Sequence, residues 1–203
     1  MHRKTAWTVC AVLGLALAAA GCGSSKSSVA APGTATTTAG AVDPNATEAL
    51  PPGDIPDNQV FVAYSPAAGG YSLRYPQGWS QRRAGTAVSF SQNFNSIAVT
   101  TSKSPAPPTA SSVRSDDVVK LQAVRGFKLV KIDSVTRTSG VAIRIVYDAT
   151  SNTDPVTGKT VTLEVERYLF WHQGTLVSLT LSSPKGSDNV DPWKTVTDSL
   201  VWK

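Results

Sequence analysis

The sequence predicts an α+β fold, in which helices flank both faces of a central antiparallel β-sheet. Apolar and polar side chains alternate every two residues in successive segments, which is typical of strands buried on one face. The alternation stops at residues 168–171, where Tyr-Leu-Phe-Trp makes both faces apolar and requires a cover on each side. Two segments with helix-start signals, near Asp116 and Asp191, could supply these covers.

The expected strands follow one another along the chain. They cover residues 71–75, 87–91, 96–101, 128–136, 141–149, 161–171 and 177–182. Thr138-Ser139-Gly140 is expected to connect the fourth and fifth strands. Trp171-His172-Gln173-Gly174 predicts a tight hairpin between the last two, with Gly174 at positive φ.

Two helices are expected. Ser115 could cap a helix over residues 116–125, with acidic residues in its first turn and Gly126 at its end. Asp191 could cap a second helix, with Pro192 at its first position. The apolar stripe of the second helix consists of Trp193, Val196 and Leu200.

The N-terminus has the pattern of a secretory signal over residues 1–21. His2-Arg3-Lys4 precedes an almost wholly apolar run at residues 6–20, which small residues follow. The run is shorter than the roughly twenty residues needed to span a bilayer. The alternative, a buried core helix, lacks caps and a polar face.

The end of the apolar run, Ala19-Ala20-Gly21-Cys22, resembles the lipobox of bacterial lipoproteins. The resemblance implies cleavage between Gly21 and Cys22 and lipidation of the Cys22 thiol. Lipoboxes usually have Leu three residues before the cysteine, where this chain has Ala19, so ordinary signal cleavage stays an alternative. Because Cys10 lies within the signal, Cys22 would be the only cysteine of the processed chain, and a free thiol is the other alternative.

Residues 22–57 form a predicted tether, and residues 58–203 form one domain. The tether is rich in Ser, Thr, Ala, Gly and Pro, and cannot bury enough apolar surface to offset the entropy of ordering. A flexible chain of this length reaches about 33 Å. The net charge of +5 is uneven, because the tether is acidic and the domain is basic.

The domain opens with Tyr71-Ser72-Leu73-Arg74-Tyr75-Pro76-Gln77-Gly78-Trp79. This segment resembles the aromatic-x-hydrophobic-x-Tyr-Pro-x-x-Trp opening of PsbP-like domains, a superfamily that includes actinobacterial lipoproteins of the LpqN type. Residues 196–202 are similar to the ending of that family, a helix followed by a short strand. The resemblance implies an antiparallel sheet between helices. It implies no catalytic residues, and the functions of the family are diverse, including photosystem assembly and protein binding.

Composition and spacing argue against most enzyme classes. Two cysteines and two histidines do not supply a Cys₄ or multi-histidine zinc site. His172, the only histidine after the signal, has no evident carboxylate partner, and no Gly-x-Ser-x-Gly elbow is present, so we expect no metal, cofactor or catalytic residue. Thr157-Gly158-Lys159-Thr160 matches the end of a P-loop motif. The full motif also needs a glycine at position 153, where this chain has Thr153, so we expect no phosphate-binding loop here. Asp188 and Asp191 lack the remainder of a calcium loop.

The best candidate for a contact surface is a polar strand face with Arg144, Glu164, Glu166, Tyr168 and His172. Either glutamate could pair with Arg144 on the neighbouring strand. A cross-strand salt bridge would then explain these residues without a functional role.

We therefore expect a lipid-anchored protein on the extracytoplasmic face of a membrane that acts as a non-catalytic binding or assembly module. Its expected partners are the membrane, through Cys22, and an envelope protein; no nucleic acid is expected, and the oligomeric state is open. An assembly module would show a broad apolar patch. The alternatives are a carrier of small molecules or lipids, with an apolar pocket, and an envelope hydrolase, with titratable groups in a cleft.

Overall fold

The structure is a computed structural model that describes residues 53–203. The predicted signal, the Gly21–Cys22 cleavage site, the lipidation of Cys22 and the tether up to residue 52 lie outside the described residues.

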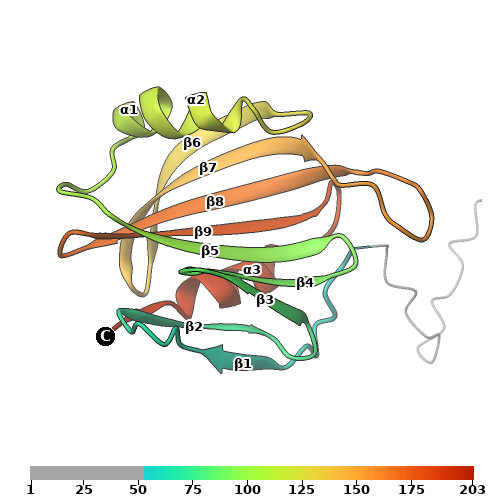
Figure 1. Cartoon of the computed structure of the whole chain (residues 1–203), viewed down its shortest axis with the longest axis horizontal. Coiled ribbons are helices and arrows are strands. Elements are labelled where there is room, and N and C mark those ends of the chain that lie inside the picture. Colours follow the sequence, from blue (N-terminus) through green and yellow to red (C-terminus); the bar gives the residue numbers. More distant parts are fainter. Residues whose placement is uncertain (1–52) are drawn as a thin grey trace, which may run out of the picture. The chain divides into compact units, whose positions relative to one another are not determined.

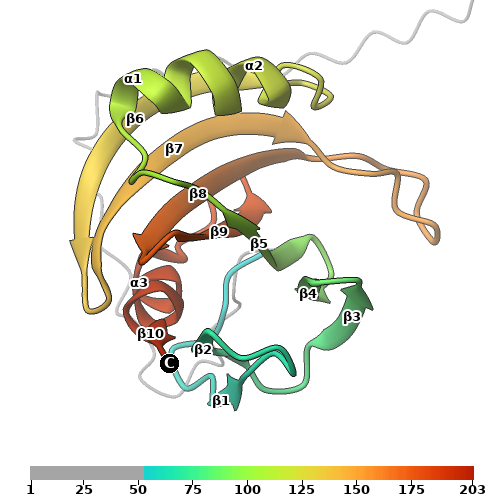
Figure 2. The ribbon, with the colours of Figure 1, turned by 60° about the vertical axis from the view of Figure 1, so that its left-hand side comes forward.

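Most strands belong to one antiparallel sheet of seven, which we call the large sheet (Figure 1). It is curved, with the remaining strands on its concave side, as Figure 2 shows. In spatial order its strands are β3 (Ser80–Ala84), β4 (Ala87–Gln92), β5 (Asn95–Lys103), β9 (Thr175–Pro184), β8 (Thr162–His172), β7 (Gly140–Thr150) and β6 (Lys128–Arg137).

A small antiparallel sheet lies inside this curve (Figure 2). Its strands, in spatial order, are β1 (Phe61–Tyr64), β2 (Tyr71–Pro76) and β10 (Val201–Trp202). The face of the large sheet that looks toward it is called the inner face. Helical residues are few: α1 (Ala110–Ser112), the π-helical turn η1 (Val113–Asp117), α2 (Val118–Leu121) and α3 (Val190–Asp198).

The main core lies between the large sheet, the small sheet and α3. Phe90 of β4 is fully buried and has two aromatic neighbours from the small sheet. Its ring stacks on Tyr75 at 3.9 Å between centroids, and Tyr64 meets it edge-on at 5.3 Å. A second core lies on the outer face, where Val113 and Val118 of the helical run pack against β7 and β8.

The prediction of a sheet flanked by helices on both faces is wrong. Strands make up about half of the described residues, and a second sheet closes the inner face. At nine residues, α3 is about 14 Å long, whereas seven strands span about 29 Å across a sheet. The helix therefore covers only part of the inner face, and Tyr64, Tyr71 and Leu73 of the small sheet complete the core.

The expected strands are confirmed, with boundaries shifted by one to a few residues. β1 and β3 were not expected. Both helices begin earlier than predicted. Thr109 caps α1 in a capping box with Ser112, so Ser115 lies inside the helical run. α3 begins at Val190 after Asn189, so Asp191 and Pro192 lie within its first turn.

Residues 53–57, which composition assigns to the tether, contact the domain. Asn189 Oδ1 accepts from the Ile55 amide at 2.8 Å, and Asn189 Nδ2 donates to the Gly53 carbonyl at 2.9 Å. Asn95 Nδ2 donates to the same carbonyl at 2.9 Å. Ile55 is buried in the main core, so these bonds fix where the chain enters the domain.

Candidate functional site

The structure brings together three of the five residues of the predicted contact surface. Arg144 and Tyr168 are register partners in β7 and β8, and Glu166 lies two residues from Tyr168 on the same inner face. Asp133 of β6, which the sequence analysis missed, is the register partner of Arg144 on its other side. Arg137 joins them from the end of β6. We call Asp133, Arg137, Arg144, Glu166 and Tyr168 the polar ladder.

Hydrogen bonds connect the whole polar ladder. Arg144 donates to both carboxylate oxygens of Asp133, from Nε at 2.9 Å and from Nη2 at 2.7 Å, and Arg144 Nη1 lies 3.4 Å from Glu166 Oε1. The Tyr168 hydroxyl donates to Glu166 at 2.5 Å and accepts from Arg137 Nη2 at 3.2 Å. Arg137 also donates to Thr197 of α3 at 2.9 Å.

Each charge in the polar ladder stabilises another. The hydrogen bond from Arg144 lowers the pKa of Asp133, with a smaller contribution from Lys131, and the bond to Asp133 raises the pKa of Arg144. Burial, followed by the bond to Glu166, raises the pKa of Tyr168. All five side chains are engaged with one another, so the arrangement stabilises the sheet and leaves no free base or nucleophile within it.

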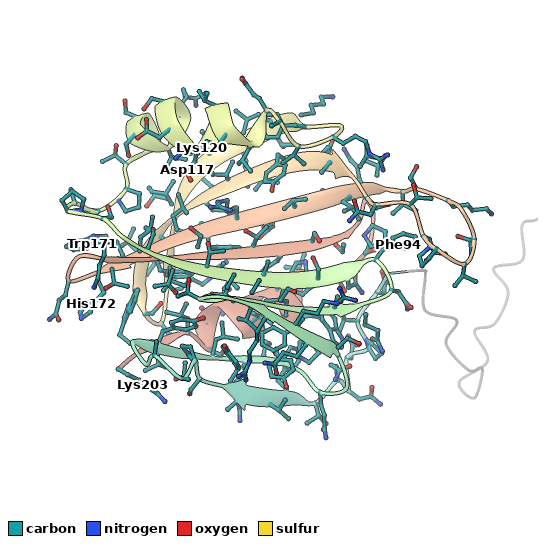
Figure 3. All side chains as sticks on the ribbon, viewed as in Figure 1. Phe94, Asp117, Lys120, Trp171, His172 and Lys203 are labelled. Atoms are coloured by element: carbon teal, nitrogen blue, oxygen red, sulfur yellow. The ribbon has the colours of Figure 1, made fainter. Side chains whose placement is uncertain are left out.

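Glu164 and His172 lie apart from the polar ladder. Glu164 is exposed near the start of β8, where its register partner is Asp148. His172 ends β8, about 27 Å from Glu164 along the strand, and its ring stacks on Trp202 with 5.3 Å between centroids. His172 lies at the tip of the β8–β9 hairpin, at the end of the molecule that carries Lys203 (Figure 3). Both loop residues, Gln173 and Gly174, have positive φ, which confirms the predicted tight turn.

A cavity of about 530 Å³ opens between the two sheets at the end where β5 finishes and β9 begins; we call it the cleft. Four separate segments form it: Tyr64 with the β1–β2 loop at residues 66–69, Arg83 with the β3–β4 turn and first residue of β4 at residues 85–87, the end of β5 at residues 101–103, and Thr175. The sequence analysis missed it because no motif marks these loops. The run of small residues Pro66-Ala67-Ala68-Gly69-Gly70 in the β1–β2 loop was the one feature of the sequence that could have indicated a cavity there.

Two cations lie on the cleft. The Arg83 guanidinium lies 5.7 Å from the centre of the Tyr64 ring, and Lys103 Nζ donates to Thr175 Oγ1 at 3.3 Å. Neither cation forms a salt bridge with a carboxylate of residues 53–203, and no Asp or Glu of this range lines the cleft.

Behind the cleft wall, the Tyr71 hydroxyl is buried without a hydrogen-bond partner. Burial, followed by the neighbouring Tyr64, raises the pKa of Tyr71 to about 12. The nearby Thr101 hydroxyl lowers the pKa of Tyr71 by a smaller amount, but it does not form a hydrogen bond with the Tyr71 hydroxyl. Tyr71 therefore stays protonated at neutral pH, as an unused donor next to two residues of the cleft lining.

Within residues 53–203, no three His, Cys, Asp or Glu side chains come together as a metal-binding group. No helix of this part has the length and hydropathy to cross a bilayer.

The lowered pKa of Asp133 predicts a loss of stability in acid. The folded protein protonates Asp133 less readily than the unfolded chain does. The stabilisation by the Asp133 carboxylate is therefore complete above the unfolded-state pKa of 3.8, and it is lost as the pH falls through the lowered pKa of the folded state. At pH 7, Asp133→Asn should lower the free energy of unfolding by about 1 kcal/mol, because the carboxylate is partly exposed. The difference from the wild type should shrink at pH 3, as measured by urea unfolding.

The matched control is Asp57→Asn, because Asp57 is exposed and forms no salt bridge within residues 53–203. It should leave stability unchanged at both pH values. An Asp133→Asn effect of equal size at pH 7 and pH 3 would contradict the ion-pair explanation.

No protein-family model matches the chain, and no curated protein matches it. Solved structures do match. PsbP of the cyanobacterium Synechocystis sp. PCC 6803 is 19% identical, with a TM-score of 0.49, over 74% of this chain and 98% of that one. LpqN of Mycobacterium tuberculosis, a protein involved in cell envelope biogenesis, is 14% identical, with a TM-score of 0.43, over 72% and 92%.

A third match is the Ran-binding protein Mog1p of Saccharomyces cerevisiae, with 14% identity and a TM-score of 0.40, over 62% of this chain and 78% of that one. The sequence motifs at residues 71–79 and 196–202 resemble PsbP-like domains, the superfamily named in the sequence analysis. At such identities, and with TM-scores below 0.5, the matches assign neither a family nor a function to this chain.

Proposed function

We propose that the chain is a non-catalytic binding module, held at the extracytoplasmic face of a membrane by lipid on Cys22, and that it binds its ligand in the cleft. The single observation that supports binding is the cleft itself. Its volume of about 530 Å³ lies within the range of small-molecule sites, and it combines small apolar walls with a few polar groups.

The chemistry of the cleft favours binding over catalysis. Its lining supplies two cations and several hydroxyls, but it has no carboxylate or imidazole to act as a general base. His172, the only histidine of residues 53–203, stacks on Trp202 and does not line the cleft. The titratable groups of the polar ladder are engaged with one another. A hydrolase is therefore the weakest of the alternatives.

The exposed apolar residues favour the cleft over a broad docking patch. In the described part of the chain, every exposed large apolar side chain is a valine, and each lies on a different element or loop. Docking surfaces for proteins usually gather several aromatic or long apolar side chains into one patch. Ligand binding in the cleft is the alternative that the structure favours, within the wider class of binding modules.

The anchor is supported by the sequence at residues 19–22. Two or more acyl chains on one cysteine give stable membrane attachment, since each buried CH₂ contributes about 0.8 kcal/mol. The composition of residues 22–52 would let the domain stand clear of the headgroups, with a reach of about 31 Å. The cleft would then be presented to the space outside the membrane.

Replacement of Cys22 by Ala tests the anchor. We expect Cys22→Ala to move the protein from the membrane fraction into the medium, and to abolish the mass increase of a diacylglyceryl group on the processed chain. The control is Cys10→Ala, which removes the other cysteine of the sequence and should leave the protein on the membrane. Membrane retention of Cys22→Ala to the same extent as the wild type would contradict the proposal of a lipid anchor.

A photoreactive amino acid in place of Ala68 tests binding in the cleft. Ala68 is exposed and lines the cleft, whereas Ser111 is exposed on α1 and serves as the control position. After irradiation of intact cells, we expect a covalent adduct at position 68 and none at position 111, as measured by mass spectrometry of the purified protein. A small adduct would indicate a carrier, and a protein adduct an assembly module. No adduct at position 68, or equal adducts at both positions, would refute binding in the cleft.

A further inference from the structure

The geometry points to a small anionic amphiphile as the ligand of the cleft: a molecule with one carboxylate or phosphate group that Arg83 and Lys103 bind, and an apolar body that lies against the small-residue wall. This inference rests on the proposed function, because it names the ligand class of the same site.

The charge of the lining selects an anion. Arg83 and Lys103 contribute two positive charges, and no Asp or Glu among residues 53–203 lines the cleft to offset them. Arg83 and Lys103 are both exposed and form no salt bridge within residues 53–203, so an anion in the cleft can approach them without displacing a carboxylate. A guanidinium binds carboxylate or phosphate with two parallel hydrogen bonds. The ammonium of a lysine adds a second positive charge, and its flexible side chain can adjust to the position of the anion.

Hydroxyl groups can complete the recognition of the anion. Thr101 and Thr175 line the cleft, and Thr175 already accepts from Lys103, so its own hydroxyl proton is free to donate. The buried Tyr71 hydroxyl lies behind Thr101 and Tyr64 and does not itself line the cleft, so the hydroxyls of the lining carry this recognition.

The walls of the cleft select an apolar body. Pro66, Ala67, Ala68 and Ala87 present small apolar side chains, and Tyr64 presents an aromatic ring. Gly69 and Gly85 have positive φ, and a Cβ added at either would meet no atom within 4 Å, so backbone conformation and not crowding requires glycine there. The cavity of about 530 Å³ beside these turns has room for a chain of several carbon atoms.

The test measures binding of eight-carbon probes by isothermal titration calorimetry. The protein is the chain from residue 22 onward with Cys22→Ala, which keeps the whole described domain in solution. The probes are octyl phosphate, octanoate, octanol and octylammonium, below their micellar concentrations, and inorganic phosphate alone. We expect octyl phosphate or octanoate to bind at least about tenfold more tightly than octanol, octylammonium and inorganic phosphate. The stronger of the two anions identifies the headgroup.

Charge removal gives a matched pair of variants. Arg82 and Arg83 are consecutive exposed residues of β3, but their side chains alternate, and only Arg83 lies on the cleft. Arg83→Gln and Lys103→Gln should each weaken binding of the preferred anion about tenfold, whereas Arg82→Gln should change it less than twofold. Circular dichroism and thermal unfolding should show that all three variants fold like the parent.

Four results would overturn the inference. Neither anionic probe binds, or octanol binds as tightly as both of them. Alternatively, inorganic phosphate binds as tightly as octyl phosphate, or Arg82→Gln and Arg83→Gln lose equal affinity. Failure of the inference is distinguishable from failure of the proposed function. If the anionic probes do not bind but the photoadduct at Ala68 forms, the cleft is a binding site for another ligand class. If neither is observed, both proposals fail.

Discussion

The fold depends on burial of the inner face of the large sheet, and above all on the aromatic contact at Phe90. One strand of a sheet cannot bury such a side chain alone, and here Tyr64 and Tyr75 of the small sheet enclose it. This contact holds the small sheet against β4. The small sheet in turn places the β1–β2 loop opposite the ends of β5 and β9, where the cleft opens. The cleft is therefore a consequence of how the core is closed.

The polar groups of the inner face divide into two kinds. In the polar ladder, every charged or hydroxyl group has a partner, and the net effect is to satisfy polar side chains on strands that also carry buried apolar ones. In and behind the cleft, Arg83 and Lys103 have no carboxylate partner among residues 53–203, and Tyr71 has no partner for its hydroxyl. The cations of the cleft are therefore available to an anionic ligand, whereas those of the polar ladder are already paired.

Local patterns predicted the strands well but not the layers. Alternation at residues 177–182 corresponds to β9, and Gly174 marks its hairpin, whereas β3, Ser-Gln-Arg-Arg-Ala, has no apolar alternation to detect. The pairing of Arg144 with Glu166 was foreseen as one of two options. Asp133 was missed because a bulge between Leu129 and Lys131 shifts the register of β6, so that alternation counted from Leu129 places Asp133 on the wrong face. The cleft joins segments up to 111 positions apart, from Tyr64 to Thr175, which no local pattern encodes.

The most direct measurement of ligand binding in the cleft is a nuclear magnetic resonance titration of the ¹⁵N-labelled chain from residue 22, with Cys22→Ala, using octyl phosphate and octanoate. Saturable amide shift changes should concentrate in residues 66–69, 85–87 and 101–103, which line the cleft, and leave the helical run at residues 110–121 unchanged. Shift changes centred on the polar ladder or the outer face, or no saturable changes with either probe, would contradict binding of an anionic amphiphile between the two sheets.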